Sequence, residues 1–368
     1  MRRIEISSSI SSIVDGYVIK LIYKKPHQDG NVSRATRILR KQAEKFRNEE
    51  LKAINTTLSD GTIVNPLNKQ AYADYLELIA RNYECLLRVH PCDFIGIIQP
   101  MFEMLIPKKA LAIDIGKSFD GQGKATSHVK FHELIVDALR YDYVQSKVYP
   151  SIARQLGIKT CVYCNAQFAI TIKNGEPLYQ LDHCYPKSLY PYLAVSFFNL
   201  QPCCGACNQR KLAEDMRKGV YDVSIWREPS DKESAYYHFH ISDSSLVDYR
   251  LNLDCEKLNI EFLTKKSAPK DLIEMRDLYV KKFRIEDIYQ EHKDVVEEVL
   301  WKYYAYTPAF IQSLNKIFKG LKKIDNRNLA RFIMGTYMNS DEVYKRPLSQ
   351  LIQDIAKQLH INFGLMKH

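Results

Sequence analysis

The sequence predicts an α+β fold, in which a mainly helical chain carries a small mixed module near its middle. Before and after the middle, apolar residues recur at spacings of three and four, as in helices that bury one face. Between these stretches, six of the nine cysteines fall within Cys161–Cys207, beside short strand-like runs. We therefore divide the chain into a helical N-terminal region (1–157), a central module (158–220), a β-hairpin-containing connection (221–268) and a helical C-terminal region (269–368).

The composition is that of a globular protein of 368 residues. Hydrophobic residues make up 46% and aromatic residues 11%, which excludes a largely disordered chain. No apolar run approaches the roughly 20 residues that cross a bilayer, and the Ser7–Ser12 stretch lacks the apolar core of a secretory signal. We expect a cytoplasmic protein without membrane contact. The net charge of +10 favours a polyanionic partner such as nucleic acid, although a solvated basic surface accounts for it equally well.

The N-terminal region begins with short strand-like segments and continues with helices. Strands are expected at Arg2–Ile6 and Tyr17–Tyr23, because the second is rich in β-branched and aromatic residues. Helices are expected at Asn31–Ile54, Gln70–Val89 and Ser127–Tyr149, where apolar side chains form one stripe. These helices would form the first part of the core.

The part that follows the module returns to a helical pattern after a short stretch of strands. Tyr221–Phe262 alternates in places, which predicts one or two hairpins. Leu272–Trp301 predicts one long amphipathic helix, and Ala309–Phe318, Asn328–Met338 and Leu348–Leu359 predict shorter helices. The C-terminal region is therefore expected to be helical.

Two C-x-x-C segments stand out, Cys161–Cys164 and Cys204–Cys207. The two-residue gap lets both thiolates of each segment point at one ion, and four thiolates at tetrahedral geometry form a closed structural Zn²⁺ site. Clustered cysteines in a reducing compartment are typical of metal binding. Cys204 is preferred to the adjacent Cys203 because only Cys204 has this gap, and Cys184 is a further thiol nearby in the sequence.

The residues between these two segments read as strand, turn, strand, loop and helix. Gln167–Ile172 and Leu178–Asp182 are expected strands, joined by an Asn-Gly pair that suits a type I′ turn. The second strand ends at Asp182 and His183. After a loop come Asn199 and the second C-x-x-C, and a polar, basic helix is expected at Asn208–Lys218.

The order of these residues resembles that of the zinc-containing HNH endonucleases, whose nuclease motif is called ββα-metal. The matching residues are Cys161, Cys164, Asp182-His183, Pro186-Lys187-Ser188, Asn199-Leu200, Cys204, Cys207-Asn208 and Lys211. The resemblance covers Lys159 to about Lys218 and implies a central zinc-bound nuclease module. Asn208 stands where the family name has its final His, and an asparagine keeps an oxygen ligand for a hard cation.

Phosphodiester hydrolysis needs a base for water and stabilisation of the charge on phosphate. His183 is the expected general base, because a neutral imidazole takes up a proton near pH 7. Asp182 and Asn208 offer oxygen ligands for one Mg²⁺ or Mn²⁺, and the resemblance implies that Asn199 orients the base through hydrogen bonds. The resemblance and their charge make Lys187, Arg210 and Lys211 the candidate phosphate contacts, although an ordinary solvated basic face accounts for Arg210 equally well.

These observations predict a metal-dependent HNH endonuclease that cuts DNA. The module is also similar to nucleases of bacterial antiphage systems, namely the PtuB-like proteins of Septu and retron systems and the type II Zorya nuclease. Because the chain has no ATPase motif, this similarity implies a partner ATPase or sensor protein. Three alternatives remain: a restriction or homing enzyme that acts alone, an RNA nuclease resembling a tRNA toxin, and a noncatalytic zinc adaptor.

Overall fold

The computed structural model describes residues 2–22, 32–51, 56–57, 63–64, 69–119, 125–320 and 325–361. Over these residues the chain is mainly helical, with seven small two-stranded sheets. The expected α+β character is confirmed at this level. Among the described helices, none combines the length and the apolar character that a membrane span requires.

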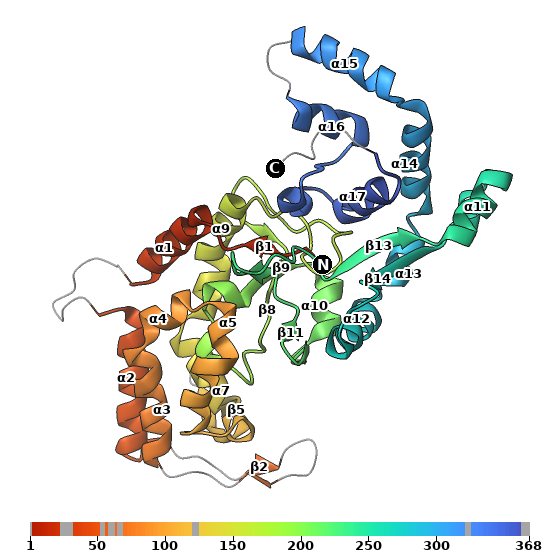
Figure 1. Ribbon diagram of the computed structural model, residues 1–368. Coiled ribbons are helices and arrows are strands. Elements are labelled where there is room, and N and C mark those ends of the chain that lie inside the picture. Colours follow the sequence, from red (N-terminus) through yellow and green to blue (C-terminus); the bar gives the residue numbers. More distant parts are fainter. Residues whose placement is uncertain are drawn as a thin grey trace.

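The N-terminal region is a set of helices (Figure 1), and its buried core is rich in aromatic side chains. Helices α2 and α3 lie side by side, and Phe46 of α2 stacks on Tyr72 of α3 with ring centroids 5.3 Å apart. The helices are α1 (Ser8–Ile22), α2 (Arg34–Arg47), α3 (Lys69–Arg81), α4 (Tyr83–Arg88), α5 (Pro91–Asp93), α6 (Gln99–Glu103), α7 (Phe131–Ala138), α8 (Tyr141–Tyr143) and α9 (Tyr149–Leu156). The strands are β1 (Ile4–Glu5), β2 (Thr56–Thr57), β3 (Ile63–Val64), β4 (Asp114–Phe119) and β5 (Ala125–Lys130).

Two expectations for this region are wrong. The strand expected at Tyr17–Tyr23 is the end of α1 as far as Ile22, because Ile10, Val14 and Tyr17 recur at helical spacing and bury one face. The helix expected from Ser127 begins only at Phe131, since 125–130 form β5, and the chain breaks again at Arg140. Tyr23, Asn31 and residues 52–54, which also belonged to expected elements, lie outside the described residues.

The central module contains a strand pair followed directly by a helix. Its elements are β6 (Ile170–Thr171), β7 (Pro177–Leu178), β8 (Gln180–His183), β9 (Leu200–Cys203), α10 (Gly205–Lys211), β10 (Arg217–Lys218) and β11 (Tyr221–Asp222). The expected hairpin is present as the short pair β6–β7, but 180–183 form a separate strand. This strand, β8, pairs antiparallel with β9, so that His183 lies opposite Leu200. The expected basic helix starts earlier, at Gly205, and ends at Lys211, because Leu212 departs from helical geometry with φ 53° and ψ −136°.

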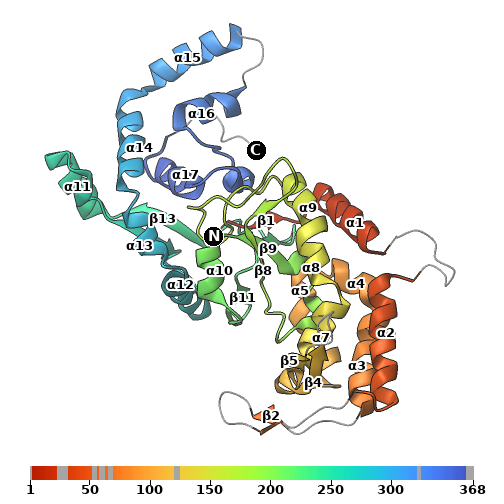
Figure 2. The same ribbon diagram turned by 180° about the vertical axis from the view of Figure 1, so that it is seen from behind.

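The C-terminal region forms an arch of helices that continues from the strands of the connection (Figure 2). The elements are β12 (Trp226–Arg227), β13 (Tyr237–Ile241), α11 (Asp243–Asn252), β14 (Ile260–Thr264), α12 (Lys270–Phe283), α13 (Ile285–Gln290), α14 (Lys293–Ala305), α15 (Pro308–Gly320), α16 (Asn326–Met334) and α17 (Ser349–Gln358). The predicted pairing of strands is present in β13–β14, with α11 inserted between them. The single helix expected at Leu272–Trp301 is instead three helices, since Arg284 has φ 56° and ends α12.

The first strand of the chain connects these regions. β1 pairs in parallel with β12, so that Ile4 lies opposite Trp226, and the N-terminus lies in the middle of the molecule (Figure 1). The Arg2 guanidinium forms an ion pair with Asp354 of α17. One continuous hydrophobic core includes buried residues from all four parts of the chain. The central module is therefore packed between the two helical regions.

Candidate metal centre and adjoining cleft

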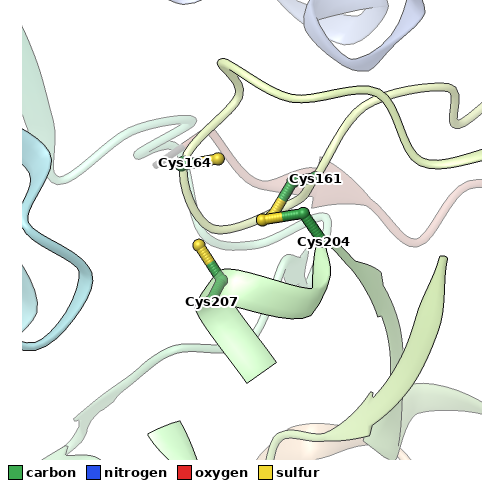
Figure 3. A group of neighbouring side chains, drawn as sticks. All are labelled: Cys161, Cys164, Cys204 and Cys207. Carbon is green, nitrogen blue, oxygen red and sulfur yellow. The ribbon is translucent and has the colours of Figure 1, made fainter. Parts of the chain in front are cut away.

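Four cysteines meet between the loop before β6 and the start of α10. Cys161 and Cys164 (the first knuckle) lie on the loop, and Cys204 and Cys207 (the second knuckle) lie at the N-terminal end of α10; their sulfur atoms point toward one another (Figure 3). All four Sγ atoms lie within 4.8 Å of one another, and none is in a disulfide. The group contains Cys204, the cysteine preferred on spacing, whereas Cys203 and Cys184 lie outside it.

The cysteine group has the chemistry of a structural zinc site. Zn–S bonds of about 2.3 Å in a tetrahedron place neighbouring sulfur atoms about 3.8 Å apart, which fits four sulfurs within 4.8 Å. Cys161, Cys164 and Cys207 are buried, so thiolates there require a cation to neutralise them. Among the described residues this is the only group of three or more Cys, His, Asp or Glu side chains close enough to hold a metal ion. The four cysteines could therefore hold a structural metal such as zinc.

A cavity of about 870 Å³, called the cleft below, opens beside this centre. One wall consists of β8 and α10, and the other consists of α7 and α8 from the N-terminal region. Four of the residues expected to act as base, metal ligand or phosphate contact line it: Asp182, His183, Lys187 and Asn208. The fold thus brings together residues that are separated along the chain by the loop and by β9.

His183 ends β8, is 5% exposed and lines the cleft. Its Nε2 lies 2.9 Å from the carbonyl oxygen of Ala194. Because a carbonyl only accepts hydrogen bonds, Nε2 carries the proton and Nδ1 keeps its lone pair. Burial lowers the pKa of His183 to about 4, although the adjacent Asp182 acts in the opposite direction. The side chain is therefore a neutral imidazole near pH 7, with Nδ1 as the basic atom.

Asn199 is fully buried and holds the loop that follows His183. Its Oδ1 accepts a hydrogen bond from the Tyr185 N–H at 2.7 Å, and its Nδ2 donates to the carbonyls of Tyr185 and Leu193 at 3.1 and 3.0 Å. Leu193 precedes Ala194, whose carbonyl accepts from His183. These hydrogen bonds can hold the loop whose Ala194 carbonyl contacts His183, as the expected orienting role of Asn199 requires. That Asn199 affects catalysis stays a prediction.

Asp182 is buried beside His183 and is tied to two other residues. Its Oδ2 accepts a hydrogen bond from the Tyr163 hydroxyl at 2.5 Å and lies 3.1 Å from the Lys211 Nζ. The Lys211 ammonium also donates to the His183 carbonyl at 2.6 Å and is 1% exposed. This position differs from the expected phosphate contact, because the charge of Lys211 is already neutralised inside the protein. The geometry favours a positioning role for Lys211.

Asn208 and the other expected phosphate contacts occupy different places. Asn208 is half-buried and its Nδ2 donates to Gln180 Oε1 at 2.7 Å, which leaves its own oxygen for another partner. Lys187 is exposed at the cleft with its Nζ 4.4 Å from the centre of the Tyr141 ring. Arg210 lies outside the residues that line the cleft and donates to the Phe283 carbonyl at 3.1 Å. Of the three expected phosphate contacts, only Lys187 lines the cleft.

The oxygen donors at the cleft fit a hydrated divalent cation. Mg²⁺ keeps several water ligands and is usually held by one or two carboxylates together with substrate phosphates. Asp182 Oδ1 and Asn208 Oδ1 both belong to residues that line the cleft, and neither has a hydrogen-bond partner among the described residues. One carboxylate and one amide oxygen would therefore be the protein ligands of such a cation.

Three residues near the site were missed in the sequence. Tyr163 lies inside the first knuckle, and Arg140 and Tyr141 line the cleft from the N-terminal region. Arg140 has a left-handed backbone with φ 60°, and its guanidinium lies 4.2 Å from the centre of the Tyr143 ring. The position of Tyr163 within the Cys-x-Tyr-Cys segment could have drawn attention to this residue. Arg140 and Tyr141 have no such sequence signal, because only the tertiary fold brings them to the cleft.

Part of the chain is similar to the Septu protein PtuB of Bacillus thuringiensis. The two proteins are 34% identical over 76 residues, which make up 20% of this chain and 28% of PtuB. The match therefore spans under a third of the relative's length. No protein-family model matches the chain, and no solved structure matches it.

Proposed function

We propose that this protein is a metal-dependent HNH endonuclease that hydrolyses DNA phosphodiester bonds. The observation that carries the proposal is the position of His183, whose Nδ1 has no hydrogen-bond partner among the described residues and which lines the same cleft as Asp182 and Asn208. The four-cysteine centre adjoins the same strand pair and supports the resemblance to zinc-containing members of that class. A neutral base next to oxygen donors is the arrangement that hydrolysis of a phosphodiester requires.

Each residue of the site has a defined task in this proposal. His183 Nδ1 takes the proton from a water molecule as the water oxygen attacks phosphorus, and the bond to the 3′ oxygen breaks. The departing 3′ oxygen takes up a proton from solvent water, which leaves a 5′ phosphate and a 3′ hydroxyl. A Mg²⁺ or Mn²⁺ held by Asp182 and Asn208 would neutralise charge on the phosphate and on the leaving oxygen. Asn199 keeps the Leu193–Ala194 carbonyls in place, so that Nε2 keeps its proton and Nδ1 stays basic. Lys187 contacts a phosphate from the exposed edge of the cleft.

We further propose that the enzyme is an effector of bacterial antiphage defence. The partial similarity to PtuB, a protein of the Septu defence system, supports this role. A defence nuclease must be held inactive until infection, which favours control by a partner ATPase or sensor protein. The formal charge of +10 favours association with a polyanion such as DNA.

Plasmid cleavage by the full-length chain tests the proposal. Supercoiled plasmid and total RNA would be incubated in parallel with Mg²⁺, Mn²⁺ or EDTA, using wild type, His183→Ala, and His238→Ala as the control. His238 lies on β13 away from the cleft, so this variant should cut as wild type does. Metal-dependent cutting of DNA that His183→Ala loses would support the proposal.

Other outcomes of the same experiment favour other functions. Cutting of RNA alone would favour the RNA nuclease, and equal cutting by His183→Ala would contradict the assignment of the base. If wild type retains zinc and binds DNA but cuts neither substrate, a zinc adaptor or a nuclease that needs its partner would be favoured over an enzyme that acts alone.

A further inference from the structure

Tyr163 links the cysteine centre to the cleft. It lies between the two cysteines of the first knuckle and is almost fully buried, with its ring stacked on Phe283 at a centroid distance of 4.5 Å. Its hydroxyl donates to Asp182 Oδ2 at 2.5 Å. A residue fixed by the cysteine centre is thus bonded directly to the carboxylate that precedes His183.

The second knuckle contacts the same carboxylate oxygen through Lys211. Lys211 is the last residue of α10, the helix that begins beside Cys204, and its Nζ lies 3.1 Å from Asp182 Oδ2. The side chain of Lys211 is fully buried and that of Asp182 is 8% exposed. Asp182 Oδ2 therefore contacts one donor within the first knuckle, Tyr163, and one donor on the helix of the second knuckle, Lys211. A metal bound by both knuckles would also fix the positions of these two donors relative to each other.

Gln201 fixes the direction in which the Tyr163 hydroxyl points. It lies opposite Asp182 in the β8–β9 pair, and its Nε2 donates to the Tyr163 oxygen at 3.1 Å and to the Val223 carbonyl at 3.2 Å. Its Oε1 accepts from the Ile225 N–H at 2.8 Å, which sets the orientation of the amide. Because the Tyr163 oxygen accepts from Gln201, its own hydrogen is directed to Asp182.

We propose that Tyr163 is a positioning residue, which together with Lys211 holds Oδ2 of Asp182 so that Oδ1 is the oxygen presented to a divalent cation in the cleft. The inference rests on the proposed function, because it assigns Asp182 to the cation. Under this inference the cysteine centre does more than stabilise the module: it sets the orientation of a ligand at the cleft. Partners that orient a metal ligand in this way typically change metal affinity by about 10- to 100-fold when they are removed.

Tyr163→Phe and Tyr289→Phe form a matched pair for the test. Tyr289 is also fully buried and its hydroxyl also contacts the first knuckle, donating to the Cys164 carbonyl at 2.7 Å, but it makes no contact with Asp182. Each substitution removes one buried hydroxyl. Both variants should retain the zinc content of wild type, which confirms that each variant has folded around the cysteine centre.

The measured quantity is the affinity for Mn²⁺, followed by electron paramagnetic resonance with the zinc-loaded protein. Asp182→Asn identifies the site, because it should lose the Mn²⁺ binding that wild type shows. We expect Tyr163→Phe to bind Mn²⁺ about 10-fold more weakly and Tyr289→Phe to bind it as wild type does. In plasmid cleavage, Tyr163→Phe should need more Mn²⁺ for half-maximal rate and should recover at high Mn²⁺, which a folding defect would not do.

The outcomes separate this inference from the proposed function. Equal Mn²⁺ affinity in the two Tyr→Phe variants, with binding lost in Asp182→Asn, would overturn the role of Tyr163 and leave the nuclease proposal standing. Absence of any Mn²⁺ binding that depends on Asp182 would overturn both the assignment of Asp182 and the inference. If Tyr163→Phe fails to retain zinc, Lys211→Met replaces it, because it removes the other donor to Asp182 Oδ2 without changing the first knuckle; unchanged Mn²⁺ affinity in that variant would also overturn the inference.

Discussion

The ring of Tyr141 lies 4.8 Å from the imidazole of His183, at an angle of 43° between the ring planes. Tyr141 belongs to α8 of the N-terminal region, whereas His183 ends β8 of the central module. The Tyr141 hydroxyl donates to the Leu181 carbonyl at 2.6 Å, and the Lys187 ammonium lies over its ring. The N-terminal region therefore builds one wall of the cleft, and the module by itself does not enclose His183.

Tyr141 should affect both stability and cleavage, and two substitutions separate the effects. Tyr141→Phe keeps the ring but leaves the buried Leu181 carbonyl without its donor, so we expect the free energy of unfolding to fall by about 1–2 kcal/mol with cleavage retained. Tyr141→Leu also removes the aromatic face under Lys187, so plasmid cleavage should fall further. Urea unfolding and cleavage rates measure the two effects. Equal cleavage by the two variants would show that the ring itself has no role at the cleft.

Removal of the structural metal should unfold the module. Cys161→Ser and Cys207→Ser each remove one of four ligands, so we expect loss of zinc and a large fall in the temperature of unfolding. Cys184→Ala and Cys203→Ala are matched controls, because both are buried cysteines of the same module that lie outside the four-cysteine group. Elemental analysis for zinc and thermal unfolding check the result. Zinc retained in Cys161→Ser, or lost in Cys203→Ala, would contradict the ligand set.

The sequence predicted the cysteine group because its signal is local. The spacing within each C-x-x-C segment fixes which thiols can share an ion, and this spacing distinguished Cys204 from Cys203. The strand that ends at His183 was predicted for the same reason, whereas its partner β9 was not, because Leu200–Cys203 was interpreted only as chain leading to the second knuckle. The helix expected at Leu272–Trp301 could not be divided correctly, because the break at Arg284 is a single left-handed residue without glycine or proline to indicate it.

The role of Lys211 could not be predicted from the sequence, because it depends on the tertiary fold. A lysine in a basic helix is usually exposed, and its charge together with the family resemblance suggested a phosphate contact. The fold instead turns its side chain inward to Asp182 and the His183 carbonyl, where the ammonium is neutralised. Conversely, Arg140 belongs to the N-terminal region and reaches the cleft only through the packing of α7 and α8. Contacts between distant segments are not encoded in local spacing.

Arg140 should contribute a phosphate contact from the N-terminal wall. A left-handed non-glycine residue costs roughly 1 kcal/mol, and here it turns the chain between α7 and α8 beside the cleft. In a His183→Ala background, Arg140→Gln should bind DNA more weakly, and the slope of log affinity against log salt should fall by about 1. Arg210→Gln is the control, because Arg210 is exposed but lies outside the cleft. Fluorescence anisotropy at several salt concentrations measures the DNA affinity and its dependence on salt. Equal slopes for Arg140→Gln and Arg210→Gln would exclude a phosphate contact by Arg140.

The depressed pKa of His183 should make the protein less stable in acid. In the unfolded chain the pKa has its ordinary value near 6.5, whereas burial lowers it to about 4 in the folded protein. Above pH 6.5 both states are neutral and the full stability is present. As the pH falls from 6.5 to 4, only the unfolded chain takes up the proton, so the free energy of unfolding should fall by about 3 kcal/mol from this residue.

His183→Gln isolates this contribution, because glutamine does not titrate and its amide can still donate to the Ala194 carbonyl. Urea unfolding of wild type and variant at pH 7, 6, 5 and 4.5 gives two curves, and the variant should lose less stability as the pH falls. Proton uptake by the cysteine ligands also weakens zinc binding in acid, but it affects both proteins alike, so the difference between the curves reports His183. Parallel curves would show that His183 is not held neutral by burial, and the base in the cleft would then titrate near its ordinary pKa.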